Sequence, residues 1–182
     1  MLPILIAYGT TEGHTRKVAE FIAERLRIRG QSVDLVDVAS PAAQQVQLIH
    51  RGAIVGGSLH HFKHQAALTN FLKSNQTWLN AMPVGLFSVS LSAALPGADD
   101  QAEAKQAADN FAADCGLKPV TISCVAGALK YDDLDYFRRL MARQIIKKIG
   151  PGSDLHSDHE YTDWDQVEVF VDNYLRDSGI SP

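Results

Sequence analysis

Short apolar segments alternate along the chain with longer segments in which apolar residues recur every three or four positions. A short apolar run is typical of a buried strand, and the longer periodicity is typical of an amphipathic helix. The strand-like segments are residues 2–8, 32–38, 52–57, 83–89 and 119–126. The helix-like segments are residues 15–29, 65–73, 99–114 and 162–177. The pattern therefore predicts an α/β protein.

Strands that alternate with helices connect through right-handed crossovers, so they form a parallel sheet with helices on both faces. We predict a doubly wound, five-stranded parallel sheet in a single domain over residues 1–182. Residues 128–160 are too long for a simple connection and predict an insertion before the last helix. Thr162, with Asp165 three residues later, predicts a capping box at the start of that helix.

This topology places a ligand site at one edge of the sheet. In doubly wound sheets, ligands bind beyond the carboxyl ends of the strands, at the point where the strand order reverses. The segments that this rule selects are Gly9–Thr15, Ser58–His64, Ser90–Ala98 and Gly127–Tyr131. We expect these four loops to meet at the site.

The first loop, "GTTEGHT", has the composition of an anion site. Hydroxyls at Thr10, Thr11 and Thr15 accompany the free backbone N–H groups of a helix N-terminus, which together bind phosphate. The loop has neither the Gly-Lys-Ser/Thr of a Walker A motif nor the glycine spacing of a dinucleotide fingerprint. It also contains no lysine, so it suits a phosphomonoester better than a magnesium-bound triphosphate. The alternative is an ordinary turn between a strand and a helix.

Beyond this loop, several segments are similar to one protein family. "GTTEGHT" resembles the FMN-phosphate loop of flavodoxins. Four further segments resemble the menaquinone-dependent protoporphyrinogen IX dehydrogenase branch of the flavodoxin superfamily: "IVGGSLHHFKHQAALTNFL", "LNAMPVGLFSVSL", "VAGALKY" and "EYTDWDQVEVFV". The resemblance runs nearly end to end. It implies a flavodoxin-like fold, FMN as cofactor, removal of hydrogen from protoporphyrinogen IX in haem synthesis, and quinones as electron acceptors.

The resemblance also implies which residues contact FMN. They lie in the four loops: Thr10, Thr11, Glu12, Gly13, His14, Thr15, Ser58, Leu59, His60, His61, Ser88, Val89, Ser90, Leu91, Gly127 and Ala128. No acid or base is assigned for catalysis, and His60, His61 and Lys130 are candidates by position alone. The chain departs from the family at positions 60 and 61, where an arginine–aromatic pair is expected, and this difference bears on the substrate more than on the flavin.

The second and third loops bear on the type of chemistry. The histidines of residues 58–64 have no carboxylate beside them and no HExxH motif, so we expect a polar wall or partial stacking on the flavin and no metal site. Neither loop contains an acidic residue before Asp99, and nearby acids would destabilise an anionic reduced flavin. We therefore expect two-electron chemistry with an open ring face, and the alternative is that these loops simply pack differently.

Residues 136–149 combine apolar residues at helical spacing with five basic residues and no acid: Arg138, Arg139, Arg143, Lys147 and Lys148. This pattern is typical of a helix drawn to anionic lipid, which fits a quinone acceptor because quinones lie in the bilayer. A helix packed on its own domain, a partner-binding helix and a lid over the substrate are the alternatives.

Composition narrows the possible functions and cellular locations of the protein further. A net charge of −4 at pH 7 argues against a general nucleic-acid binder, and the two cysteines form no CxxC redox pair. The first residues lack the features of a secretory signal, and no apolar run approaches the roughly 20 residues of a membrane-spanning helix. We expect a cytoplasmic protein with peripheral contact to the inner face of the cell membrane. Two other functions stay open: a flavodoxin-type electron carrier without its own substrate, and a flavin-free interaction domain.

Overall fold

The computed structural model describes residues 2–47, 49–60, 63–129 and 159–181. Most of the predicted insertion, including the basic segment 136–149 and Lys130, lies outside the described residues, and so does His61. Within the described ranges, no helix is long and apolar enough to cross a bilayer.

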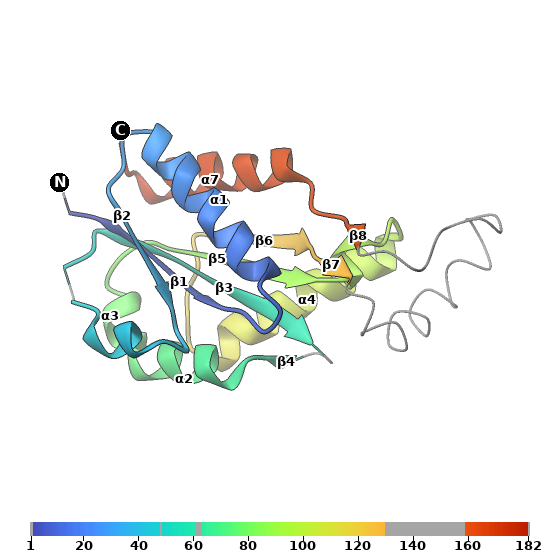
Figure 1. The fold of residues 1–182 in the computed structure, drawn as a ribbon, viewed down its shortest axis with the longest axis horizontal. Coiled ribbons are helices and arrows are strands. Elements are labelled where there is room, and N and C mark those ends of the chain that lie inside the picture. Colours follow the sequence, from blue (N-terminus) through green and yellow to red (C-terminus); the bar gives the residue numbers. More distant parts are fainter. Residues whose placement is uncertain (1, 48, 61–62, 130–158, 182) are drawn as a thin grey trace.

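A parallel sheet of five strands forms the centre of the molecule, as predicted (Figure 1). Its strands are β1 (Ile4–Gly9), β2 (Val33–Asp37), β3 (Gly52–His60), β5 (Val84–Ser90) and β6 (Thr121–Ala126). Their spatial order is β2-β1-β3-β5-β6, so the chain leaves β1 in one direction and returns to its other side with β3. The strand order therefore reverses beside β1, and the predicted ligand edge is the one at the carboxyl ends of β1 and β3.

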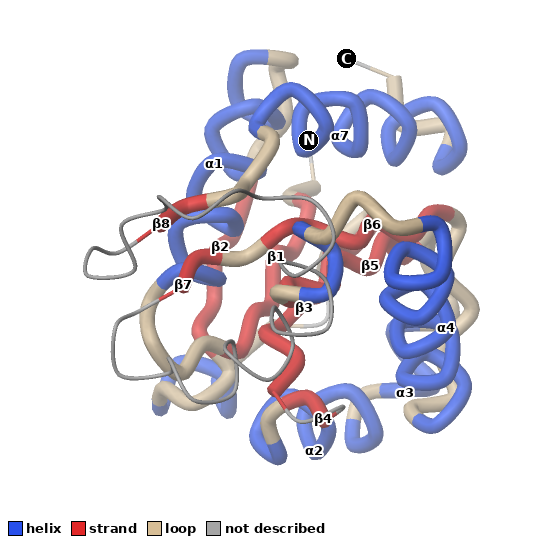
Figure 2. The backbone as a smooth tube through the Cα atoms, turned by 90° about the vertical axis from the view of Figure 1, so that its right-hand side faces the viewer, coloured by secondary structure: helices blue, strands red, loops and turns tan. Residues whose placement is uncertain are grey.

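Helices cover both faces of this sheet (Figures 1 and 2). One face carries α1 (His14–Ile28) and α7 (Trp164–Ser178), and the other carries α2 (Ala66–Ser74), α3 (Gln76–Leu79) and α4 (Ala98–Asp114). Two short 3-10 helices, η1 (Pro41–Gln45) and η2 (Ser92–Ala94), follow β2 and β5. The chain thus has the flavodoxin-like doubly wound arrangement, with α3 and the two 3-10 helices as elements that the periodicity did not predict.

The core lies in two layers, one on each side of the sheet. Along β1, Ile4 and Ile6 pack toward α1 and α7, whereas Leu5 packs toward the helices of the opposite face. Successive side chains of a strand point to opposite faces, so a strand covered on both sides is apolar at nearly every position. This is why the central strands appear in the sequence as continuous apolar runs.

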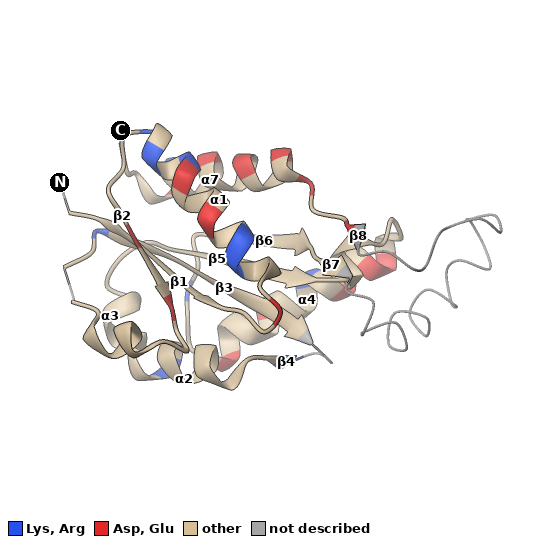
Figure 3. Ribbon diagram, in the orientation of Figure 1, with Lys and Arg blue, Asp and Glu red and all other residues tan. Residues whose placement is uncertain are grey.

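Ion pairs join α1 to α7 across the outer surface, where Figure 3 shows acidic and basic residues on both helices. Arg29 near the end of α1 contacts Glu168 at 3.0 Å and Asp172 at 2.6 Å. At the opposite end of α1, Lys17 contacts Glu160 at 2.6 Å. Polar contacts therefore hold α7 to the end of α1 and hold β8, which precedes α7, to the start of α1, in addition to the apolar layer beneath the two helices.

The start of α7 differs from the predicted capping box. Asp163 is the N-cap residue, and its carboxylate accepts hydrogen bonds from the backbone N–H groups of Asp165 and Gln166, both at 3.1 Å. The Thr162 hydroxyl instead donates to the carbonyl oxygen of Ala126 at 2.7 Å. The prediction was wrong by one residue because a tertiary contact at the end of β6 uses the threonine. By contrast, Gly30 follows α1 with a φ of 76°, as expected of a glycine that ends a helix.

The second predicted loop is also more regular than expected. β3 continues to His60, and β4 (Lys63–His64) returns antiparallel beside it, with Leu59 opposite His64 and His60 opposite Lys63. Residues 58–64 therefore begin and end as a two-stranded ribbon. A second ribbon pairs β7 (Ala128–Leu129) with β8 (His159–Glu160), which brings the two ends of the insertion together.

Candidate functional site

The register of the sheet brings the four predicted segments to one edge. Gly9 at the end of β1 lies opposite Gly57 of β3, and Ser58 lies opposite Val89 of β5. Ser90 in turn lies opposite Ala126 at the end of β6. The segments that follow these strands are consequently neighbours in space, although up to 120 residues separate them in the chain. The strand ends at which the four predicted segments begin therefore lie side by side at this edge.

The first loop folds back onto itself through its hydroxyls. Thr10 accepts a hydrogen bond from the backbone N–H of Gly13 at 3.0 Å, and Thr11 accepts one from the side chain of Gln65 at the start of α2. Gly13 precedes α1 with a φ of 93°, a conformation that L-residues rarely adopt, and a Cβ at this position would meet no heavy atom within 4 Å. Open space therefore lies above the turn.

The first turn of α1 has the donors that an anion needs. No side chain within the described residues caps the helix, and its first turn contains no acidic residue. The N–H groups at its start are thus available, and the helix dipole favours a negative charge beside them. Thr15 is 1% exposed within this turn, and Glu12 is half-buried in the loop before it. The residues present fit a phosphate held by backbone N–H groups and hydroxyls.

At the end of β3, Ser58 has a hydroxyl that the protein itself does not satisfy. Ser58 is only 9% exposed, and its Oγ has no hydrogen-bond partner within the described part of the chain. A buried hydroxyl without a partner is unfavourable unless a ligand or water completes it. Its place on the strand beside β1 puts this unsatisfied group at the same edge as the phosphate loop.

The ribbon after Ser58 is held from the opposite face of the sheet. His64 Nε2 lies 3.1 Å from the Ser88 hydroxyl, and the His64 ring stacks on Phe111 of α4 with centroids 3.8 Å apart and planes 21° apart. His64 is therefore engaged in packing the ribbon. Nothing is described of the His60 side chain, and His61 lies outside the described residues. In the described parts of the chain, no cluster of three metal-ligating side chains occurs.

The third segment uses its serines internally. Ser88 contacts His64, and the Ser90 hydroxyl lies 3.1 Å from that of Ser92 and accepts from the backbone N–H of Ala93. Val89, between the two serines, packs in the core layer under α1 and α7. Leu91 directly precedes η2. The Ser88 hydroxyl thus holds β4, and the Ser90 hydroxyl holds together the turn after β5.

The fourth segment connects the insertion to the sheet edge. The N–H of Gly127 donates to Ser90 at 3.0 Å, and the carbonyl oxygen of Gly127 accepts from the N–H of Tyr161 at 3.2 Å. Ala128 then pairs with Glu160 in the ribbon of β7 and β8. The backbone at the end of β6 is fixed on both sides by these bonds.

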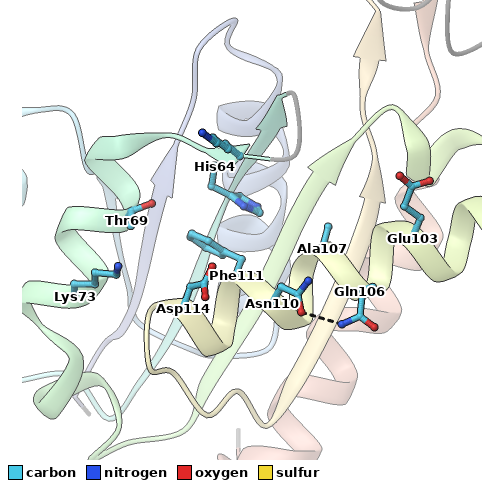
Figure 4. Close-up of a pocket in the computed structure, with 10 residues that line it drawn as sticks. His64, Thr69, Lys73, Glu103, Gln106, Ala107, Asn110, Phe111 and Asp114 are labelled. Atoms are coloured by element: carbon cyan, nitrogen blue, oxygen red, sulfur yellow. Dashed lines mark hydrogen bonds between the residues drawn. The ribbon is translucent and has the colours of Figure 1, made fainter.

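A groove of about 600 Å³ runs between α2 and α4, next to β4 (Figure 4). Its α2 side carries the cations of Lys63 and Lys73, and its α4 side carries the carboxylates of Glu103 and Asp114. No residue of the phosphate loop lines it. The groove is consequently separate from residues 9–15, and the stacked pair of His64 and Phe111 is part of its lining.

Two residues that sequence reasoning did not assign to the site contact its first loop. Thr162 lies 2.7 Å from the Nε2 of His14, the first residue of α1, and Gln65 bonds Thr11. Burial lowers the pKa of His14, although the nearby carboxylate of Glu160 acts in the opposite direction. The His14 ring is therefore neutral near pH 7. "EYTDW", quoted above for its family resemblance, contains Thr162, but nothing in that motif alone indicates a contact with residue 14.

Comparison with known proteins agrees with this geometry. A family model described as a flavodoxin domain matches residues 5–155. The chain belongs to the flavodoxin family. A curated relative from Escherichia coli K12, protoporphyrinogen IX dehydrogenase [quinone], is 30% identical to this flavodoxin-family chain over 167 residues, which cover 92% of the chain and 91% of the relative. A relative of the same name from Leishmania major is 29% identical over 174 residues, 93% of this chain and 73% of its own length.

Among solved structures, oxidised flavodoxin 2 from Bacillus cereus superposes with a TM-score of 0.58 at 16% identity, covering 96% of this chain and 98% of that one. At this identity the likeness concerns the fold alone.

Proposed function

We propose that this protein is an FMN-dependent oxidoreductase that oxidises protoporphyrinogen IX and passes the electrons to a quinone. The observation that carries the proposal is the uncapped start of α1 after a loop, residues 9–15, without lysine or arginine, in a chain similar over 92% of its length to a protoporphyrinogen IX dehydrogenase [quinone]. That loop suits a phosphomonoester, and FMN has one. The Ser58 hydroxyl, buried and unsatisfied at the same edge, provides a second polar contact for a ligand.

Each part of the edge has a separate role in binding. The N–H groups that follow Gly13 and the hydroxyls of Thr10, Thr11 and Thr15 would hold the phosphate. Ser58, together with the backbone after β3, β5 and β6, would border the rest of the cofactor. FMN, when bound, supplies the two-electron oxidation of an organic substrate. The protein's own contribution is to fix these groups before binding, since the turns are already held by the internal bonds of Thr10, Ser88 and Ser90.

A quinone acceptor also supports contact with a membrane. Quinones partition into the bilayer, and residues 136–149 have the sequence of a basic amphipathic helix. We propose that this segment binds anionic lipid from the surface. Replacing its five basic residues with glutamine should weaken sedimentation with vesicles that contain an anionic lipid, and binding equal to that of the wild type would contradict the proposal.

The direct test measures both cofactor and turnover. The purified protein should contain FMN near one equivalent per chain, and protoporphyrinogen IX supplied with a menaquinone analogue should yield fluorescent protoporphyrin above the rate without enzyme. Bound FMN without turnover would favour the second candidate, a flavodoxin-type electron carrier, which the shared fold also supports. A protein that neither contains nor binds FMN would contradict both.

A further inference from the structure

A short segment ahead of α7 lies on the first turns of α1, and Thr162 is its centre. The Thr162 hydroxyl donates to the carbonyl oxygen of Ala126 at 2.7 Å, and His14 Nε2 lies 2.7 Å from the same hydroxyl oxygen. A hydroxyl has one proton, and here that proton is used for Ala126. His14 must therefore donate from Nε2, so these bonds run in one direction from α1, through Thr162, to the end of β6.

The residues on either side of Thr162 attach to α1 as well. Glu160 accepts hydrogen bonds from Lys17 at 2.6 Å and from the indole N–H of Trp164 at 2.9 Å. The Trp164 ring lies 4.8 Å from the ring of Phe21, and the Lys17 ammonium lies 5.3 Å from the Trp164 centroid. We call Glu160, Thr162 and Trp164 the α7 clasp. Its contacts reach His14, Lys17 and Phe21 in the first two turns of α1.

The position of His14 explains why this clasp matters. His14 directly follows Gly13, so its backbone N–H is among the uncapped donors at the start of α1. Residues 9–15 contain no lysine or arginine. Binding of a phosphate by these residues therefore depends on backbone N–H groups that point at it. A side chain that fixes His14 relative to β6 consequently fixes the donors themselves.

We propose that Thr162 is a positioning residue for the phosphate loop. It holds His14, and with it the first N–H groups of α1, in the place that the monophosphate of FMN requires. The inference rests on the proposed function, because it takes FMN as the ligand. It adds that a residue almost 150 positions away in the chain sets the affinity for the phosphate and leaves the affinity for the rest of the flavin unchanged.

Riboflavin makes this selective effect measurable, because it is FMN without the phosphate. Apoprotein is titrated with each flavin, and quenching of flavin fluorescence gives the two Kd values. Thr162→Val removes the hydroxyl but retains the shape, and it should weaken FMN binding about tenfold, the size expected for one buried hydrogen bond, while the riboflavin Kd stays within about twofold. Thr162→Ser should restore FMN affinity.

Two further variants separate positioning from general damage. Ser178→Ala is the matched control, since its hydroxyl also donates to a backbone carbonyl, that of Leu175 at 3.1 Å, but at the far end of α7. It should leave both Kd values unchanged. His14→Ala breaks the same link from α1, so it should reproduce the selective loss, and the double variant with Thr162→Val should be little worse than either alone.

The outcomes are distinct. Equal weakening of FMN and riboflavin in Thr162→Val would show that Thr162 merely supports the fold, and unchanged FMN binding would show that it positions nothing; either result overturns the inference. A wild-type protein that binds riboflavin and FMN equally would also overturn it. A wild-type protein that binds neither flavin would refute the proposed function itself.

Discussion

The absence of a cation from residues 9–15 allows a sharp electrostatic test of the phosphate site. Thr11 is exposed, and its hydroxyl accepts a hydrogen bond from Gln65. Thr11→Glu introduces a carboxylate beside the expected phosphate, and Thr11→Gln introduces a side chain of the same size without charge. Both variants lose the same threonine hydroxyl, so the difference between them isolates the charge.

The expected size follows from Coulomb's law. A phosphate with two negative charges at about 6 Å from one carboxylate is repelled by about 1.4 kcal/mol at the dielectric constant of water, and by about 5.5 kcal/mol at an effective constant of about 20. The lower figure alone corresponds to about tenfold in Kd. Thr11→Glu should therefore bind FMN at least tenfold more weakly than Thr11→Gln, and added salt should narrow the gap.

The assay titrates each apoprotein with FMN and with riboflavin and follows flavin fluorescence. Riboflavin carries no phosphate, so its affinity should be the same in both variants. Circular dichroism of the two apoproteins checks that both are folded. If Thr11→Glu and Thr11→Gln bind FMN equally well at low salt, the phosphate does not lie at this loop, and the proposed site is misplaced.

Further variants test other contacts of the site. Burial lowers the pKa of His14 below the ordinary value of about 6.5, so the folded protein binds this proton less tightly than the unfolded chain does, and stability should fall as the pH drops below that value. Urea unfolding should show a smaller loss between pH 7 and pH 5 in His14→Gln than in the wild type, and parallel curves would contradict this. Asp163→Ala removes the N-cap of α7 and should lower the free energy of unfolding by about 1 kcal/mol in the same assay, whereas no change would mean that the cap contributes nothing. Ser58→Ala should leave the apoprotein as stable as the wild type or more stable, because its Oγ has no partner in the described protein, and yet weaken FMN binding; a clear loss of apoprotein stability would show that Ser58 is satisfied within the protein.

Much of the fold follows from the sequence because both faces of the sheet are covered. Continuous apolar runs such as residues 83–89 arise from that double burial, and this run locates β5 to within one residue, whereas β3 ends three residues beyond the predicted segment 52–57. The doubly wound parallel sheet, and the edge of it at which a ligand is expected, then follow from general rules of parallel sheets. What the sequence did not predict depends on single tertiary contacts. Thr162 has the local pattern of an N-cap, but the carbonyl of Ala126 takes its hydroxyl and Asp163 caps the helix instead.

The serines at the end of β5 show the same limit. Their number and position suggested groups directed at a flavin, yet Ser88 contacts His64 and Ser90 contacts the following turn. Ser58 has the same residue type and the same place at a strand end, and its hydroxyl is the one left without a partner in the described protein. Side-chain direction alternates along a strand, and Ser88 on β5 lies opposite Gly57, the residue before Ser58. Ser58 and Ser88 therefore point to opposite faces of the sheet, and only the register of the two strands decides to which face each serine points.

Two sets of contacts, one made by His64 and one by Thr162, therefore support the candidate site from opposite faces of the sheet. On one face, His64 holds the ribbon after β3 through Ser88 and Phe111; on the other, Thr162 holds the phosphate loop through His14. Phe111 belongs to the core layer under α2, α3 and α4, whereas Trp164 of the α7 clasp packs against the layer under α1 and α7. A loop that recognises phosphate without a cation needs its donors placed in advance, because it cannot recover affinity by moving a charged side chain. The proposed phosphate turn can thus remain short and free of lysine and arginine as long as the segment before the last helix stays attached to the start of the first.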